Sequence, residues 1–307
     1  MSSWWSHNRQ LVLQLAGTLL AIFLLLFLLR EEGWSEILTA MSEIKAVDLL
    51  RVALLFAVSR LAVVSRWHIL FVSAGARIRF RNSLALTFMG LFAGNFLPTT
   101  IGGDLVRLAG ALQMGFDRAV SFASIAADRL IGMLGMSMSV PIGLAYSWSL
   151  LPLGPGASIL IPLFQKPVAF FRKMASIFSM WVKKPVSLLA ALACTWVHMF
   201  CLFSSIYVLV DDLGSHVSFW MIAGLWSLTY FITLIPISIN GYGLQELSFT
   251  FLLSNVAGLT PAVSLTIAVV IRAYFLLFSL PGAIFLPSIL SAIAKQKAVI
   301  SSPEPLL

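Results

Sequence analysis

Long apolar runs dominate this sequence and leave it few ways to fold in water. In the first, Leu11 to Leu29, the only polar side chains are Gln14 and Thr18. As a helix it is roughly 28 Å long, enough to cross the hydrocarbon core of a bilayer. Of the 307 residues, 60% are hydrophobic and 10% charged, too few polar residues to cover a water-soluble globule. The sequence therefore predicts an all-α integral membrane protein, and disordered, secreted and nucleic-acid-binding proteins are excluded.

The distribution of charge predicts how the chain crosses the membrane. The formal net charge is +8, and cytoplasmic loops of membrane proteins are enriched in Lys and Arg. Acidic residues follow the first apolar run, whereas Arg77, Arg79 and Arg81 follow the second, and Lys295 and Lys297 lie near the end. We therefore expect both termini in the cytoplasm. We read the first run as an uncleaved helix because no small-residue cleavage site follows it.

Two apolar stretches are too short to span and are broken by proline and glycine. The first covers 84–116 and is broken at Pro98, Gly102 and Gly103; the second covers 220–256 and is broken at Pro236, Gly241 and Gly243. Broken backbone at membrane depth has to be buried in protein or to line a water-filled cavity. We interpret both stretches as re-entrant hairpins.

The rest of the chain completes a single membrane domain, 1–307. Lys166 to Lys184 repeats aromatic residues at helical spacing between basic residues, which predicts an amphipathic helix on the cytoplasmic surface of the membrane. About six full transmembrane helices accompany the two hairpins. They are expected at 11–29, 49–72, 119–140, 144–164, 186–210 and 262–286.

The two breaks resemble each other in sequence. Pro98-x-Thr100-Ile101-Gly102-Gly103 aligns with Pro236-x-Ser238-Ile239-Asn240-Gly241. Each hairpin is third in an order of helix, helix, hairpin, helix, and the two units start on opposite sides of the membrane. We therefore predict an inverted repeat with halves 1–140 and 144–290. Such repeats place a transport site at the midplane, between their broken helices.

The alignment of the two predicted halves extends to single residues. Arg60 lies 38 residues before Pro98, and His198 lies 38 residues before Pro236. Arg129 and Arg272 follow the two prolines at 31 and 36 residues.

Ionisable residues inside the apolar segments are the candidate functional residues. Each costs on the order of 2.5–3.5 kcal/mol at the bilayer centre unless it is paired or hydrated. The five arginines outnumber the three carboxylates by two, which favours a site for an anionic group such as phosphate. The backbone N–H groups where the helix restarts at Gly102-Gly103 favour an anion as well. The eight residues are Arg60, Arg66, Asp104, Arg107, Asp128, Arg129, Glu246 and Arg272.

Structural roles compete with this interpretation. Asp104 stands where a helix-capping acid belongs, and Arg66 is long enough to reach the cytoplasmic interface. Asp128 and Arg129 point to different faces of one helix, and each can pair with a neighbouring helix. Taken together with the two breaks, Arg107, Glu246 and Arg272 are our preferred functional residues.

Motifs of enzymes and of cofactor sites are missing from the sequence. There is no G-x-x-x-x-G-K-[ST], H-E-x-x-H or G-x-S-x-G sequence. Cys194 and Cys201 lie two helical turns apart, too far for a disulfide, with His198 between them. We read them as helix-packing residues and expect neither a metal nor a cofactor.

Three motifs resemble the transmembrane, flippase-like domain of the lysylphosphatidylglycerol synthase family. They are Asn95 to Arg107 (NFLPTTIGGDLVR), Asp128 to Gly132 (DRLIG), and Ile235 to Ser238 (IPIS) with Gly241 to Glu246 (GYGLQE). Asn240 departs from the pattern, which often has glycine there. The resemblance implies a bacterial or archaeal inner-membrane protein. No aminoacyl-transferase domain follows Leu286, so we expect a stand-alone member that does not make the modified lipid.

The resemblance and the charges lead to one hypothesis and two alternatives. The hypothesis is a flippase that moves a phosphate-bearing, aminoacylated or polyprenyl-linked lipid between leaflets and is not an enzyme. Its partners are that lipid and a separate synthetase or glycosyltransferase. The alternatives are a membrane component of lipid-linked glycan or lipid-modifying synthesis, and a scaffold for a synthetase.

Overall fold

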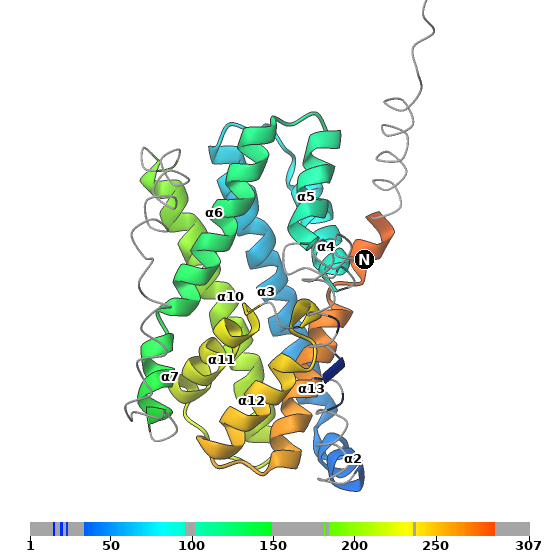
Figure 1. The fold of residues 1–307 in the computed structure, drawn as a ribbon, viewed down its shortest axis with the longest axis vertical. Coiled ribbons are helices and arrows are strands. Elements are labelled where there is room, and N and C mark those ends of the chain that lie inside the picture. The colour runs from blue at the N-terminus through cyan, green and yellow to red at the C-terminus, as the bar shows by residue number, and fades with distance from the viewer. Residues whose placement is uncertain are drawn as a thin grey trace, which may run out of the picture.

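The computed structural model describes most of the chain, and every regular element in it is a helix (Figure 1). The described residues are 34–95, 97, 102–148, 181, 184–235 and 238–285, with Leu15, Leu19, Leu20 and Phe23. Nearly all of the expected first helix and of the expected interfacial helix lies outside them, as do Pro98 and Pro236. The α-helices are α2 (Trp34–Glu43), α3 (Ala46–Ser73), α4 (Phe80–Gly94), α5 (Gly102–Gln113), α6 (Arg118–Ser137), α7 (Val140–Tyr146), α10 (Pro185–Asp212), α11 (Phe219–Thr233), α12 (Leu244–Asn255) and α13 (Pro261–Leu277).

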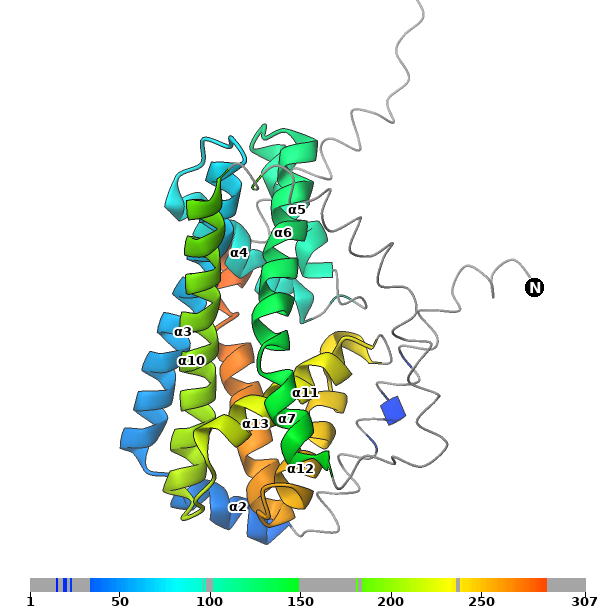
Figure 2. The same cartoon turned by 90° about the vertical axis from the view of Figure 1, so that its left-hand side faces the viewer.

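Helices α3 and α10 form the central pair of the fold and run side by side along its length (Figures 1 and 2). Each has 28 residues, and α10 begins with Pro185, whose missing N–H costs nothing in a first turn. Lys45, just before α3, donates from its backbone N and from Nζ to Asp212 at the end of α10, each at 2.8 Å. The Asp212 carboxylate thereby raises the pKa of Lys45 and links the start of α3 to the end of α10.

Two short helices, α4 followed by α5, lie where the first hairpin is expected; that this hairpin is re-entrant stays a prediction. With 15 and 12 residues, these helices are roughly 22 and 18 Å long, too short to cross a bilayer. They pack closely because Gly103 lies against the backbone of Gly90, where a Cβ atom would collide with the carbonyl oxygen. Gly90 and Gly103 therefore have a packing role in this hairpin.

Where the second hairpin is expected, α11 is followed by α12, and these helices also have 15 and 12 residues. Between them lies a single 3-10 turn, Ile239–Gly241. Asn240, Gly241 and Gly243 have φ values of 50°, 72° and 74°, in the left-handed region that favours glycine and tolerates asparagine. Gly241 and Gly243 are thus required by the backbone, and Asn240 is compatible with it.

Helices α6 and α13 follow the two hairpins and begin with matching caps. The Asp117 side chain accepts from the N–H of Val120 at 2.9 Å, and the Thr260 hydroxyl accepts from that of Val263 at 3.4 Å. Most of the helix expected at 119–140 is α6, and α7 continues the same helical segment as far as Tyr146. The returning helix expected at 144–164 therefore does not begin at Leu144, and its residues 149–164 lie outside the described part of the chain. The helix expected from Ala262 is confirmed as α13, which begins one residue earlier.

The core has two main parts, one toward each end of the molecule. Trp67, Phe71 and Leu86 belong to the cluster built by α3 to α6, whereas Phe56, Trp226 and Phe249 belong to the cluster built by α3 and α10 to α13. Both views place α4 and α5 toward one end and α11 and α12 toward the other (Figures 1 and 2). Polar residues gather between the two clusters.

Three of the described helical segments are long and apolar enough to cross a membrane: Arg118–Tyr146, Pro185–Asp212 and Pro261–Phe285. Helix α3 matches α10 in length but carries Asp48, Arg51, Arg60 and Arg66. Large apolar side chains such as Leu54 on α3 and Phe200 on α10 are each 61% exposed, as expected of residues that face lipid. The protein is thus a helical membrane protein; the total of six spans stays a prediction.

Candidate functional site

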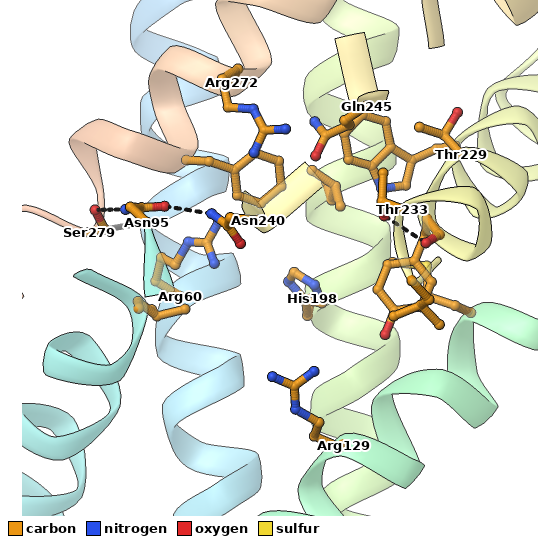
Figure 3. Close-up of a pocket in the computed structure, with 17 residues that line it drawn as sticks. Arg60, Asn95, Arg129, His198, Thr229, Thr233, Asn240, Gln245, Arg272 and Ser279 are labelled. Carbon is orange, nitrogen blue, oxygen red and sulfur yellow. Dashed lines mark hydrogen bonds between the residues drawn. The ribbon is translucent and has the colours of Figure 1, made fainter. Parts of the chain in front are cut away.

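A cavity of about 300 Å³ lies where the tips of the two hairpins meet helices α3, α6, α10 and α13. Three guanidinium groups reach it from three different helices: Arg60 from α3, Arg129 from α6 and Arg272 from α13 (Figure 3). The other polar residues in its wall are Asn95, His198, Thr229, Tyr230, Thr233, Asn240, Gln245 and Ser279. Apolar side chains, among them Met136, Trp226 and Phe275, complete the wall.

Arg60 is the most isolated charge at this cavity. It is 6% exposed, and its Nε and Nη2 atoms have no hydrogen-bond partner among the described residues. Its guanidinium carbon lies 4.8 Å from the ring centroid of Phe275 and 5.7 Å from that of Phe56. The aromatic faces stabilise the cation but leave its N–H donors unused, which suits an incoming acceptor.

Arg129 and Arg272 occupy matching places in the two halves. Each is the twelfth residue of its helix, and each donates from Nε to the acid that is third in the preceding half-helix. The pairs are Arg129 with Asp104 and Arg272 with Glu246. In both pairs one acid holds the guanidinium at the cavity wall.

The hairpin tips are joined by neutral hydrogen bonds. The Asn240 amide donates to Asn95 Oδ1 at 2.9 Å, and the Asn95 amide donates to the Ser279 hydroxyl at 2.8 Å (Figure 3). On the second tip, Arg272 Nη2 donates to the carbonyl of Gly241 at 3.1 Å. The cavity is thus bounded by residues of both broken segments.

A second group of charges lies deeper in the protein, away from the cavity wall. Asp128 accepts from Arg66 Nε at 2.6 Å and from Arg107 Nη1 at 3.1 Å. Arg107 also contacts Asp104 at 3.3 Å and lies 4.4 Å above the ring of Trp67. We call Arg66, Arg107 and Asp128 the buried charge network.

This network shows where two of the intramembrane arginines lie. Arg66 is 8% exposed and bound to Asp128, which favours a buried, paired arginine over the alternative of one that reaches the membrane interface. Arg107, one of the preferred residues, lines a smaller cavity of about 150 Å³ rather than the main one. Gly103 and Asp104 line that smaller cavity too, while Gly102 is buried at the first position of α5.

The structure also shows where the two surplus positive charges of the eight intramembrane residues lie. Arg272 is balanced by Glu246, whereas Arg66, Arg107 and Arg129 share Asp104 and Asp128. One surplus charge therefore belongs to this shared group, which reaches the cavity at Arg129. The other is Arg60, which has no carboxylate partner among the described residues.

The sequence interpretation did not select the uncharged part of the cavity wall. His198, whose Nδ1 lies 2.7 Å from the Ser59 hydroxyl, was noticed as the counterpart of Arg60 in the repeat and as a packing residue between Cys194 and Cys201. Asn95 and Gln245 stand inside the motifs quoted above, which was an available signal. Thr229 and Thr233 lie on the buried face of an apolar helix and carry no pattern that distinguishes them from packing residues.

A helical membrane protein with an arginine-lined cavity between two broken hairpins is the class that this geometry defines. Residues 14–282 match the family described as the lysylphosphatidylglycerol synthase TM region. The chain belongs to this family, and the resemblance drawn from its motifs is confirmed. No curated protein matches the chain.

Proposed function

We propose that this protein moves a phosphate-bearing lipid from one leaflet of the membrane to the other. The observation that carries the proposal is the convergence of Arg60, Arg129 and Arg272 on one cavity between the hairpin tips. Guanidinium groups match phosphate oxygens in geometry and charge. A cavity of about 300 Å³ is large enough for a head group and too small for two acyl chains, which stay in the lipid.

The proposed mechanism rests on an inverted repeat. The lengths of corresponding helices support it: α3 and α10 have 28 residues each, α4 and α11 have 15, and α5 and α12 have 12. The two matching acid–arginine pairs support it as well. In such a repeat, one half rocks against the other and exposes a central site to each side in turn.

The membrane setting of the proposal follows from charge. We place the protein in the inner membrane of a bacterium or archaeon, with both termini and the basic loop at Arg77 to Arg81 in the cytoplasm. Its role is transport rather than catalysis, on a lipid that a separate synthetase or glycosyltransferase makes.

The test is lipid movement in proteoliposomes, measured by reduction of a fluorescent phosphatidylglycerol as it reaches the outer leaflet. Arg60→Gln keeps hydrogen-bonding capacity but removes the isolated charge, and we expect transport to fall at least tenfold. Arg51→Gln is the matched control on the same helix, because the Arg51 side chain is 65% exposed and far from the cavity wall. Its rate should stay within twofold of wild type.

Wild-type transport by Arg60→Gln would contradict this site assignment, provided that both variants keep the wild-type melting temperature in detergent. A melting temperature lowered only in Arg60→Gln would point to a structural role for Arg60. In that case Arg129→Gln and Arg272→Gln decide whether the cavity binds lipid.

A further inference from the structure

We infer that the cavity selects head groups with a net negative charge and rejects those that carry a cationic aminoacyl group. This inference rests on the proposed function and narrows its substrate. It concerns the charge that the wall presents to a bound lipid, and it therefore separates phosphatidylglycerol-like lipids from their lysyl derivatives.

The first step is the charge of the wall itself. Three arginines line the cavity, and no carboxylate does so among the described residues. The two acids nearest to these arginines do not line the cavity and are already bound by arginines: Asp104 contacts Arg107 and Arg129, and Glu246 contacts Arg272. A bound head group therefore meets guanidinium groups first.

The second step is what a lysyl group would meet there. Its ammonium groups bring positive charge to a wall that already holds three cations, at a depth where charges are poorly screened. An ammonium group needs acceptors, and a carboxylate is the acceptor that compensates its lost hydration best. The cavity wall offers amide and hydroxyl oxygens in place of a carboxylate.

The third step is that the same wall suits an anionic head group with hydroxyl substituents. A phosphate can accept from Arg60, whose Nε and Nη2 are unpartnered among the described residues. The hydroxyls of Thr229 and Thr233 already donate to backbone carbonyls at 3.0 and 2.7 Å, so their oxygens remain acceptors for a glycerol or sugar hydroxyl. The amide of Gln245 offers both a donor and an acceptor.

The experiment compares four fluorescent lipids in proteoliposomes containing the full chain: phosphatidylglycerol, phosphatidic acid, phosphatidylethanolamine and lysylphosphatidylglycerol. We expect the two anionic lipids to move at least tenfold faster than lysylphosphatidylglycerol, with the zwitterionic lipid between them. Equal rates, or faster movement of the lysyl lipid, would overturn the inference. Comparing the two anionic lipids also distinguishes a preference for the phosphodiester of phosphatidylglycerol from one for the phosphomonoester of phosphatidic acid.

A single substitution tests the cause. Gln245→Glu changes almost no volume but adds the missing carboxylate to the cavity wall, so we expect the ratio of phosphatidylglycerol to lysylphosphatidylglycerol transport to fall at least fivefold. Gln113→Glu, near the end of α5 and outside the cavity wall, is the control and should leave the ratio unchanged. An unchanged ratio in Gln245→Glu would contradict the electrostatic basis of the selection.

Binding separates this inference from the proposed function. In native mass spectrometry, the detergent-solubilised protein should retain phosphatidylglycerol in preference to lysylphosphatidylglycerol, and Arg60→Gln should lose that preference. Selective binding without movement of any lipid would support the selection and contradict the transport proposal. Movement of lipids without any preference would support the transport proposal and contradict the selection.

Discussion

The two hairpins share an acid–arginine pair, but only the first has a further ion pair one turn along its second helix. Both carry an acid as third residue of the second half-helix, bound to the twelfth residue of the next helix: Asp104 to Arg129, and Glu246 to Arg272. One turn further along α5, Arg107 contacts Asp128 of α6. The corresponding positions of α12 and α13 are Phe249 and Ile271, both fully buried in the larger apolar cluster.

The difference separates the charges by role. Buried ion pairs can often be replaced by apolar residues of similar volume without loss of stability, and the second half of the chain has apolar residues at these positions. Under the proposed function, charge that recurs in both parts of the chain and faces the cavity serves to bind the lipid head group. Charge that occurs in one half only, away from the main cavity, is explained by packing between α3, α5 and α6.

The largest expected effect breaks the buried charge network. Asp128→Ala leaves Arg66 and Arg107 buried without their shared carboxylate, and should lower the free energy of unfolding by about 3–5 kcal/mol. The conservative change Ile271→Val, at the corresponding apolar position, should cost only about 0.5–1.5 kcal/mol. Thermal and denaturant unfolding in detergent measure both, and equal costs would remove the contrast between the two halves.

The next effect concerns the arginines that the halves share. Arg129→Gln and Arg272→Gln each remove a charge-assisted contact to phosphate and should reduce lipid transport about 10- to 100-fold. Arg118→Gln, at the exposed start of α6, is the control for the first and should transport normally. A large loss in only one of the two variants would show that the halves are not equivalent in function.

A smaller effect is expected at Arg107. In Arg107→Met, Asp128 keeps Arg66 and Asp104 keeps Arg129, so we expect a loss of about 1–2 kcal/mol in stability. Transport should stay within threefold of wild type once the amount of folded protein is matched. A folded Arg107→Met protein that transports nothing would place Arg107 in the functional site and the smaller cavity on the lipid path.

The smallest effect is expected at the contact between hairpin tips. Asn240→Gly keeps the left-handed backbone but removes the hydrogen bond to Asn95, and should cost about 1 kcal/mol or less. Asn240→Ala loses the same bond and adds backbone strain, so it should be the less stable of the two. Melting temperatures of the pair check this order, and the reverse order would mean that the turn does not require positive φ.

Much of the fold could be predicted because apolar length, proline and glycine act locally. The hairpins, the boundaries of α10 and the places of Gly241 and Gly243 follow from such signals. Arg60, Arg129 and Arg272 were found because charge in an apolar segment is costly wherever it lies. Which arginine meets which acid depends on contacts between distant helices, and for this reason the pairing of Arg66 and Arg107 with Asp128 could not be read from the sequence.

The cavity beside the apolar core affects how this protein balances stability against activity. The cavity borders the larger cluster through Met136, Leu202 and Trp226, and its wall holds Arg60, whose Nε and Nη2 find no partner among the described residues. Evolution toward a tighter core would fill this cavity first, since large apolar residues there would gain packing and remove the cost of the buried cation. The unfilled cavity is therefore a place where selection for activity opposes selection for stability, and stabilised variants of the protein should be screened for changes at its wall before any others.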